Sequence, residues 1–394
     1  MKRFVSLVAI LLLLALHALH PEGAIAGTRK AGTMRVAPVK GRAIPNHYIV
    51  TLRAGANPQA VAAIAGVAPK YVYTAALNGF AAALTPGQLN AIQHQRSVQS
   101  VEQDQEVHID ATETMDANGD PWGLDRIDQR SLPLSRSYSY TGGGSGVRAY
   151  IIDTGIQTSH PDFGGRASAV YDALGGNGQD CNGHGTHVAG TVGGATYGVA
   201  KAAYLRAVRV LDCSGSGSIS GIIAGVNWVA QNSIHPAVAN MSLGGNYSAS
   251  LNSAVTSLVN SGVFVAVAAG NSSADACNYS PPSAPGTYTV AAEDRTDTRA
   301  SFSNYGGCVD GYAPGVGIKS DWLSSGTNTI SGTSMATPHV TGVGALYKGD
   351  YGDASASTII NWIYNNATAN VIKGNPAGTN NLLLYKRAHY LCTF

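Results

Sequence analysis

The chain has 394 residues, of which 44% are hydrophobic and 12% charged, and its formal net charge is +2. This composition excludes a disordered chain and favours a well-buried globular protein with more than one folded unit. Residues 1–111 carry 10 Lys/Arg and 5 Asp/Glu, whereas residues 112–394 carry 15 and 18. Because the basic residues are scattered along the chain, the charge pattern argues against a nucleic-acid partner.

The N-terminus has the pattern of a secretory signal. A positive start at Lys2 and Arg3 precedes an apolar run over residues 4–16, and residues 24–26 supply the small side chains that signal peptidase prefers. The apolar run is shorter than the roughly 20 residues that a membrane anchor needs. We therefore expect a signal peptide over residues 1–26, secretion to the extracellular space, and no membrane association after its cleavage.

Residues 45–110 have the pattern of a small α+β unit. Its predicted order is a strand, a helix, a strand pair, a helix and a strand, over residues 44–52, 58–67, 71–84, 86–95 and 98–110. Asn78-Gly79 is a hairpin-turn signal within the strand pair, and Pro86 suits the first turn of a helix. This βαββαβ order is a split βαβ unit, whose small core makes it marginally stable alone.

From about residue 120 the pattern changes to apolar strands alternating with helices. Five short runs, apolar on both faces, have the character of buried parallel strands, over residues 147–153, 204–211, 237–243, 262–270 and 287–293. Helical stretches lie between them, over residues 184–194, 220–232 and 251–262. The alternation predicts an α/β fold with a doubly wound, mostly parallel sheet and helices on both faces. Active sites in such sheets lie at the carboxyl ends of the strands.

Three motifs in this second part point to nucleophilic catalysis. Asp153 ends a predicted strand in Asp-Thr-Gly, His184 begins HGTHVAG at a loop-to-helix junction, and Ser334 lies in SGTSMATPH before an apolar helix. A serine hydroxyl needs a histidine base, and a buried carboxylate orients that histidine. An aspartic protease needs two Asp-Thr-Gly motifs, and this chain has one. An α/β-hydrolase needs GxSxG, which the GTSMA segment around Ser334 does not match. The presence of all three motifs in this order therefore predicts an Asp-His-Ser triad, and this order is known for this catalytic chemistry.

Secretion makes disulfides the expected state of the cysteines. Cys181, Cys213, Cys277 and Cys308 allow three pairings, of which neighbour pairing, Cys181–Cys213 and Cys277–Cys308, is the simplest. Metal binding by these cysteines is disfavoured because none of them forms a CxxC pair. Cys392 has no assigned role.

Several segments resemble the defining motifs of the subtilase superfamily. They are IIDTG, NGHGTHVAGT, NMSLGG, AVAAGN and SGTSMATPHV, and they resemble most closely the proteinase K branch and its aqualysin-type bacterial enzymes. The resemblance covers about residues 120–387, and ALNGFAAAL and VEQDQ resemble the family's inhibitory prodomain. It implies a prodomain over residues 27–111, a subtilisin-like catalytic domain over residues 112–387 and a short C-terminal tail over residues 388–394.

The resemblance also implies roles for further residues. The Asn271 side chain and the Ser334 backbone N–H would form the oxyanion hole, and His187 and His339 match structural positions. Two edge segments would pair with an extended peptide, and a wall of small residues would shape a primary pocket with a broad preference for aliphatic or aromatic side chains. The edge segments are Gly215, Ser216, Gly217 and Ser242, Leu243, Gly244, and the wall is Ala268, Ala269, Gly270.

Calcium is the implied metal, in a structural role and with no catalytic cofactor. Pro285, Thr287 and Asp310 match a tight calcium site of two backbone carbonyls and a carboxylate. A second site of some aqualysin-type enzymes matches a set in which serines replace the later ligands, so that this site is expected to be weakened or lost. That set is Asp125, Asp128, Gln129, Ser135 and Ser137.

Together these features predict a secreted, monomeric serine endopeptidase that cleaves proteins and peptides with broad specificity. Autocleavage near residues 110–116 would activate it, and the prodomain would inhibit it by leaving its C-terminal tail in the substrate cleft. Two alternatives remain open from the sequence. One is a catalytically silent homologue that acts as a binding protein, and the other is an esterase or acyltransferase that uses the same triad.

Overall fold

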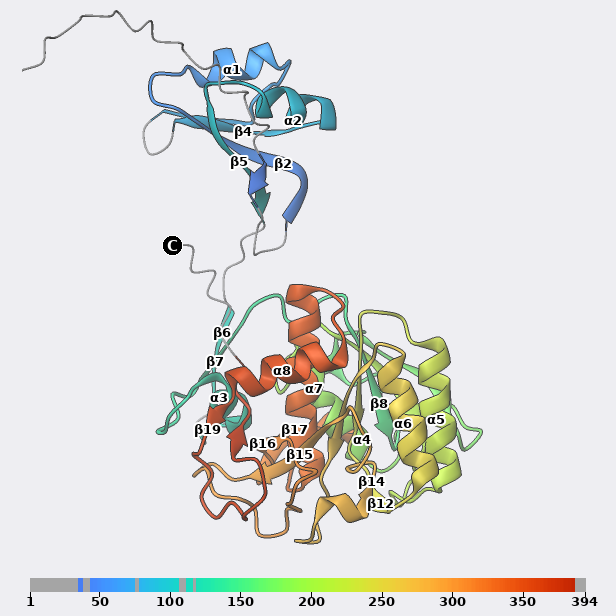
Figure 1. The fold of residues 1–394 in the computed structure, drawn as a ribbon. Coiled ribbons are helices and arrows are strands. Elements are labelled where there is room, and N and C mark those ends of the chain that lie inside the picture. Colours follow the sequence, from blue (N-terminus) through green and yellow to red (C-terminus); the bar gives the residue numbers. More distant parts are fainter. Residues whose placement is uncertain (1–34, 38–42, 75–77, 106–110, 116–117, 387–394) are drawn as a thin grey trace, which may run out of the picture. The chain divides into compact units, whose positions relative to one another are not determined.

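A computed structural model describes residues 35–37, 43–74, 78–105, 111–115 and 118–386 of the chain. Contacts divide these residues into two compact units, with the boundary between Asp104 and Gln105, and each unit is considered by itself (Figure 1). The predicted signal peptide (1–26) and the predicted tail (388–394) lie outside the described residues.

The first unit is a five-stranded sheet with two helices on one face. Apart from the short β1, its elements follow the predicted βαββαβ order. The sheet order is β1-β5-β2-β4-β3, in which β4 pairs antiparallel with β2 and β3. The elements are β1 (Val36–Ala37), β2 (Ala43–Leu52), α1 (Pro58–Ile64), β3 (Tyr71–Tyr73), β4 (Gly79–Ala83), α2 (Pro86–Gln93) and β5 (Val98–Gln105).

The core of this unit is small, as its length requires. Eleven buried hydrophobic residues form it, among them Val50 of β2, Phe80 of β4 and Ile92 of α2. Helix α2 begins with a capping box in which the side-chain oxygens of Thr85 and Gln88 each accept the other's backbone N–H, which supplies acceptors that the start of the helix lacks. Local capping thus supports helices that a core of this size holds only weakly.

The expected hairpin turn at Asn78-Gly79 is wrong. Strands β3 and β4 do pair, but Gly79 is the first residue of β4, opposite Tyr73. A Cβ atom on Gly79 would lie 2.1 Å from the carbonyl oxygen of Val50, so the glycine permits close contact with β2. The Asn78 side chain instead donates to the carbonyl of Arg53 at 2.9 Å. The pair therefore serves strand packing rather than a two-residue turn.

The second unit contains a nine-stranded sheet and its covering helices (Figure 1). Its helices are α3 (Trp122–Asp128), α4 (His184–Gly193), α5 (Ile219–Asn232), α6 (Ala249–Asn260), α7 (Thr333–Tyr351) and α8 (Ala356–Asn366). The strands of the main sheet are β8 (Arg148–Asp153), β9 (Ala167–Asp172), β10 (Tyr204–Arg209), β11 (Ala237–Met241), β13 (Phe264–Ala268), β15 (Tyr288–Glu293), β16 (Gly311–Pro314), β19 (Thr368–Ala369) and β20 (Leu382–Leu383). Three two-stranded ladders complete it, namely β6 (Ala111–Thr114) with β7 (Ser137–Tyr140), β12 (Gly245–Asn246) with β14 (Tyr279–Ser280), and β17 (Ile318–Trp322) with β18 (Gly326–Ile330).

The order of the main sheet confirms the doubly wound prediction. It runs β19-β20-β16-β15-β13-β11-β8-β10-β9, and every neighbouring pair is parallel except β19 with β20. Strand β8 pairs with β10 on one side and with β11 on the other, so the strand order reverses at β8. A crevice forms at such a reversal, beyond the carboxyl ends of the strands. Asp153 is the last residue of β8 and therefore lies at this crevice.

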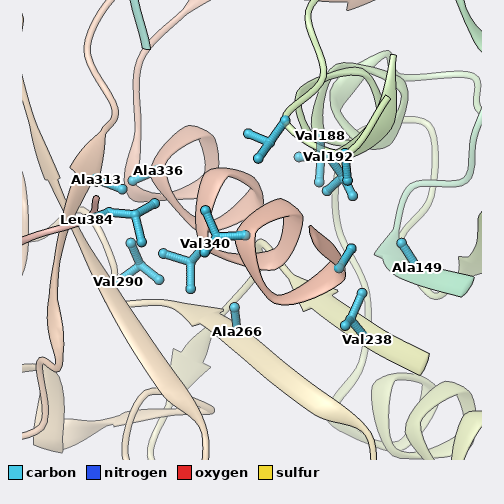
Figure 2. Packing of buried hydrophobic residues seen from close by; sticks show 14 of the residues in the cluster. Ala149, Val188, Val192, Val238, Ala266, Val290, Ala313, Ala336, Val340 and Leu384 are labelled. Atoms are coloured by element: carbon cyan, nitrogen blue, oxygen red, sulfur yellow. The ribbon is translucent and has the colours of Figure 1, made fainter. Parts of the chain in front are cut away.

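The main sheet is buried on both faces. Along β8, Ala149 and Ile151 belong to the cluster that α4 and α7 cover, whereas Tyr150 and Ile152 belong to the cluster that α5 and α6 cover. Figure 2 shows the first cluster, in which Val340 of α7 points among side chains of the sheet. Each fully buried aliphatic side chain contributes about 1.5–3 kcal/mol. The strand ends are therefore held rigidly from two sides.

A buried carboxyl group of the β17–β18 ladder packs against α4, where a Cβ atom on Gly190 would lie 2.6 Å from a carboxylate oxygen of Asp321. Asp321 of β17 is 0% exposed, and no described residue donates a hydrogen bond to its carboxylate oxygens. Burial raises the pKa of Asp321 to about 8, the charge of Asp162 adds to this rise, and Lys201 and Arg166 oppose it. At neutral pH this carboxyl group is therefore protonated, and it can donate a hydrogen bond to the Asp162 carboxylate.

This protonation gives the stability a defined pH dependence. The ordinary pKa of the group is 3.8, so the unfolded chain releases the proton above about pH 4 while the folded chain keeps it up to about pH 8. The contribution of Asp321 to stability is complete below pH 4 and is lost as the pH rises to 8.

We expect the substitution Asp321→Asn to remove this loss. Between pH 5 and pH 8 the free energy of unfolding of the variant, relative to that of the parent chain, should rise by about 1.4 kcal/mol per pH unit, because only the parent must take up a proton on folding. Denaturant unfolding at each pH measures the difference. Parallel curves for the two proteins across this range would show that Asp321 does not hold the proton.

Candidate active site

At the carboxyl end of β8, Asp153 contacts His184, the first residue of α4. The Nδ1 atom of His184 lies 2.8 Å from Oδ1 of Asp153, which also accepts the backbone N–H of Thr154 at 2.7 Å. Asp153 is 0% exposed, and the His184 side chain is 25% exposed. The fold thus brings together the first two predicted triad residues, with the carboxylate inside and the imidazole at the surface.

The close approach of α4 to the end of β8 requires a small residue after His184. A Cβ atom on Gly185 would lie 2.1 Å from the carbonyl oxygen of Gly155. The Gly185 N–H donates instead to the Thr154 hydroxyl at 2.9 Å. A glycine at this position therefore lets the first turn of the helix lie against the strand end, which brings His184 within reach of Asp153.

The charges around His184 favour its protonation. Burial lowers the pKa of the imidazole, but the charge and hydrogen bond of Asp153 and the charge of Asp180 raise it, and the net shift is upward from 6.5. A histidine whose imidazolium is stabilised in this way can take up a proton and then return it.

Ser334 is the second residue of α7, at the carboxyl edge of the same sheet. Its hydroxyl donates to the carbonyl oxygen of Ser242 at 3.2 Å, and its own carbonyl accepts the Ser242 hydroxyl at 2.7 Å. These bonds occupy the hydroxyl, and no hydrogen bond joins the described side chains of Ser334 and His184. In enzymes without substrate such contacts are often long and tighten on binding.

Two N–H donors lie around one point beside Ser334. The side-chain nitrogen of Asn271 and the backbone nitrogen of Ser334 are each 3.6 Å from the position that a Cβ atom on Gly332 would occupy. The Asn271 carbonyl oxygen accepts both the N–H and the hydroxyl of Thr333 at 2.9 Å, which fixes its amide orientation. The positive end of the α7 dipole adds to the field at this point. The arrangement suits a developing negative charge on oxygen.

Two adjoining clefts border these residues. The larger, of about 750 Å³, is lined by His184 and by both predicted edge segments, Gly215, Ser216, Gly217 and Ser242, Leu243, Gly244. The smaller, of about 210 Å³, is lined by Ser334, Asn271 and the predicted wall, Ala268, Ala269, Gly270. Leu243 and Gly244 border both, so the clefts form one continuous groove along the carboxyl edge of the sheet.

Several residues that line this groove were not predicted from the sequence. Leu211, Ile219 and Ile222 give the larger cleft an aliphatic wall, and Tyr247, which is 60% exposed, lies at its border. The run SISGII, where the Ser-Gly-rich segment passes into α5, was the available signal for this wall.

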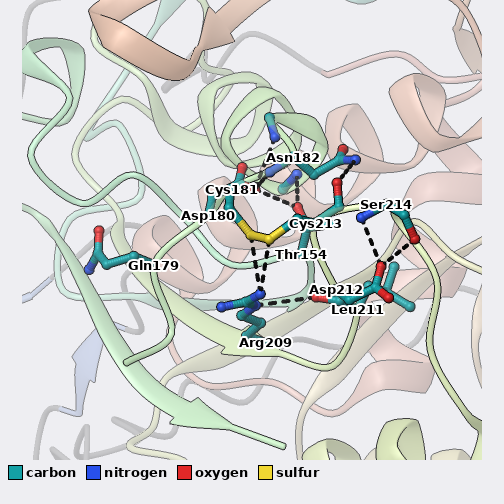
Figure 3. The surroundings of a disulfide bond; sticks show 12 residues. Thr154, Gln179, Asp180, Cys181, Asn182, Arg209, Leu211, Asp212, Cys213 and Ser214 are labelled. Carbon is teal, nitrogen blue, oxygen red and sulfur yellow. Dashed lines mark hydrogen bonds between the residues drawn. A yellow bond between two sulfur atoms is a disulfide. The ribbon is translucent and has the colours of Figure 1, made fainter. Parts of the chain in front are cut away.

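A disulfide holds the first edge segment to the loop before His184. Cys181 and Cys213 are bonded, and the side chain of Asn182 donates to the carbonyl of Cys213 at 3.0 Å (Figure 3). Asp212 accepts the backbone N–H groups of Ser214 and Ser216, which shapes the turn into the segment. The groove and the histidine loop are therefore tied by covalent and polar contacts.

The second disulfide joins Cys277 and Cys308, so both bonds have the simplest of the three possible pairings. Cys308 packs against a buried cluster at the β15–β16 side of the sheet, which includes Val309 and Tyr312. Cys392 lies outside the described residues.

The three residues predicted to hold calcium lie on neighbouring segments. Pro285 and Thr287 precede β15, and the Asp310 N–H donates to the carbonyl of Thr289, at the start of β15, at 2.9 Å. Burial raises the pKa of Asp310, whose carboxylate oxygens accept the Thr289 N–H at 2.6 Å and the Tyr364 hydroxyl, and no lysine or arginine of the described chain forms an ion pair with it. Because a cation would offset the desolvation of this carboxylate and all three donors are oxygen atoms, the residues fit a hard cation.

The second predicted calcium set does not fit a cation. Asp125 accepts the Ser135 hydroxyl at 2.8 Å and the Arg136 N–H at 2.5 Å. Asp128 pairs with the ammonium group of Lys386 at 3.1 Å, and the Lys386 side chain is only 5% exposed. The Lys386 ammonium group therefore already supplies the positive charge that calcium would bring to this set, whereas no such charge of the described chain acts on Asp310. Lys386 was not among the residues predicted from the sequence.

His187 and His339 are buried inside α4 and α7. Burial lowers the pKa of each imidazole to about 4, so both are neutral at physiological pH. His187 contacts the carbonyl of Ile318 at 3.0 Å, and His339 contacts that of Met335 at 2.9 Å. These contacts agree with the structural roles expected for both.

Comparison with known families gives two matches, each confined to one part of the chain. Residues 144–383 match the subtilase family, and residues 47–110 match the peptidase inhibitor I9 family. The first match covers the main sheet and the residues of the groove.

Individual relatives agree with these matches. The chain is 48% identical over 388 residues to an extracellular serine proteinase of Thermus sp. (strain Rt41A), covering 90% of this chain and 94% of that protein. It is 44% identical to proteinase R of Parengyodontium album, covering 88% and 90%. A crystal structure of a cold-adapted subtilisin-like serine proteinase is 54% identical, with a TM-score of 0.67, and covers 68% of this chain and 98% of that one.

Proposed function

Because the chain belongs to the subtilase family and is a serine endopeptidase, we propose that Asp153, His184 and Ser334 are its catalytic triad. The observation that carries the proposal is the contact of 2.8 Å between the buried Asp153 carboxylate and Nδ1 of His184, at the point where the strand order reverses. Among the described residues that line the groove, no other imidazole is paired with a buried carboxylate.

In the first step the Ser334 hydroxyl turns from the Ser242 carbonyl toward Nε2 of His184 and attacks the scissile carbonyl carbon. His184 takes the hydroxyl proton and becomes an imidazolium, which Asp153 stabilises through the Nδ1–H bond. His184 then returns the proton to the leaving amine. A water molecule releases the acyl group from Ser334 by the same sequence of proton transfers.

The oxyanion of each tetrahedral intermediate would lie between the Asn271 side chain and the Ser334 backbone N–H. Thr333 supports this role because it holds the carbonyl oxygen of the Asn271 amide and so leaves the NH₂ group for the groove. A preoriented donor needs no reorganisation as charge develops, and this is a large source of rate enhancement.

The substrate is proposed to be an extended segment of a protein or peptide. The edge segments Gly215–Gly217 and Ser242–Gly244 flank the larger cleft, where they can pair with an added strand. Small residues and an adjoining aliphatic wall favour broad acceptance of apolar side chains. Because the edge segments can pair with a peptide backbone, the groove favours peptides over the simple esters of the rival hypothesis.

We propose that the unit matching the inhibitor family acts as an intramolecular inhibitor that autocleavage near residues 110–116 removes, leaving a monomeric catalytic domain from about residue 112. Secretion agrees with the signal pattern of residues 1–26 and with the extracellular relative. Among the described residues, no helix has the length and hydrophobicity that crossing a membrane requires.

A structural calcium ion is proposed at the carbonyls of Pro285 and Thr287 and the carboxylate of Asp310. When bound, it would neutralise the buried carboxylate and tie the start of β15 to the segment before β16. It takes no part in the proton transfers.

Ser334→Ala should abolish both maturation and peptide hydrolysis, because no other group can form the acyl intermediate. We expect a loss of about 10⁴- to 10⁶-fold in kcat with a peptide anilide. The matched control Ser253→Ala, at an exposed position of α6, should retain activity. Normal cleavage of casein by the Ser334 variant would exclude the proposed triad, and hydrolysis of esters but not casein by the parent chain would favour the esterase hypothesis.

Asp310→Asn should remove the effect of calcium on thermal stability. Chelation should lower the unfolding temperature of the parent chain, because a cation that binds only the folded state stabilises it. The Asn variant should show a small difference or none, while Asp128→Asn, in the set that does not fit a cation, should keep the parent's difference. Calorimetric titration with calcium gives the stoichiometry directly. Equal calcium binding by the Asp310 variant and the parent would place the site elsewhere.

A further inference from the structure

The loop before α4 carries a carboxylate that the mechanism above does not use. One oxygen of Asp180 accepts the Thr154 hydroxyl and the N–H groups of Asn182 and Gly183, each at 2.9 Å. The other accepts the N–H of Thr186 at 2.9 Å and its hydroxyl at 2.6 Å. All five partners are donors, so the group acts as a fully satisfied carboxylate.

We propose that Asp180 is a positioning residue that fixes His184 relative to Asp153, an inference that rests on the triad proposed above. Thr154 follows Asp153 directly, and Gly183 and Thr186 flank His184 in sequence. One carboxylate therefore holds both segments whose separation determines the contact between Asp153 and His184.

The Thr154 hydroxyl extends this link. It donates to Asp180 at 2.9 Å and accepts the Gly185 N–H at 2.9 Å, so it joins the strand end to the helix in two directions. Any movement of the first turn of α4 away from β8 must break several of these bonds at once. A misplacement of about 1 Å at such a point can cost about 100-fold in rate.

Asp180 also supplies the cap that α4 lacks. The residue before the helix is Gly183, which has no side chain to accept the free N–H groups of the first turn. The Asp180 carboxylate accepts two N–H groups there, from Gly183 and Thr186, and its negative charge faces the positive end of the helix dipole. The helix start that carries His184 is therefore stabilised from outside the helix.

Asp180 acts through other residues and not on the substrate. It does not line either cleft, although its partners Thr154 and Asn182 line the larger one. The charged or titratable groups that act on His184 are Asp153 on β8 and Asp180 on the loop, and His187 on α4 is neutral at physiological pH. Removal of the Asp180 charge should therefore be visible in the titration of His184.

The test is Asp180→Asn in the secreted, matured enzyme, with active sites counted by titration. We expect kcat for a tetrapeptide anilide to fall about 10- to 100-fold with little change in KM. The acid limb of the pH profile of kcat/KM should move to lower pH, because a negative charge that raises the pKa of His184 is gone.

Asp294→Asn is the matched control. The Asp294 carboxylate also accepts three loop donors, from Thr296 and Thr298, and none of these donors belongs to α4 or β8. This variant should keep both the rate and the acid limb of the parent. Thr154→Ala combined with Asp180→Asn should be clearly less than additive in its effect on kcat, because both changes break the same bond.

Thr186→Val is the milder variant if Asp180→Asn fails to mature, since it keeps the charge and removes only the Thr186 hydroxyl, which donates to Asp180 and accepts the Gln157 N–H. It should lower kcat while leaving the acid limb in place. An Asp180 variant that behaves like the Asp294 control, or that loses rate with an unmoved acid limb, overturns the positioning role. A Ser334→Ala enzyme that stays active overturns the triad itself, whatever the Asp180 variant does.

Discussion

The contact between the buried Asp153 carboxylate and the His184 imidazole is the interaction on which the rest of the site depends. A carboxylate without solvent is costly unless donors surround it; here the Thr154 N–H and the imidazole face Oδ1, while Oδ2 is buried and accepts no hydrogen bond from the described residues. Those donors come from a strand end and a helix start that are separate in the chain. The doubly wound sheet supplies both at one edge, because the strand order reverses at β8.

Rigid packing fixes the positions of the strand ends at this edge. Side chains of β8 alternate between two buried clusters, so the strand cannot shift without disturbing helices on both faces. The polar groups gather where the packed strands end, and there Asp180 and the Cys181–Cys213 disulfide hold the loops that carry the histidine and the first edge segment. Apolar packing fixes the positions of the strands and helices, and local polar contacts fix the loops of the site relative to them.

Much of this could be predicted from local sequence. Strands such as β8 and β13 are continuous apolar runs, and the groove residues lie in motifs that resemble a known family. The β17–β18 ladder was missed because its strands mix polar and apolar residues, and Asn78-Gly79 misled because strand packing outweighs turn propensity there. The pairing of Asp128 with Lys386 joins distant parts of the chain, and no local pattern reports such a contact.

The central claim is that Asp153 stabilises the imidazolium of His184. The most direct measurement is a histidine-labelled NMR titration of the mature enzyme and of its Asp153→Asn variant, with the signal assigned by its loss in His184→Ala. The account predicts that His184 titrates above 6.5 in the parent enzyme and at a lower pH in the variant, because burial then acts without the opposing charge. An unchanged titration in the Asp153 variant would contradict it.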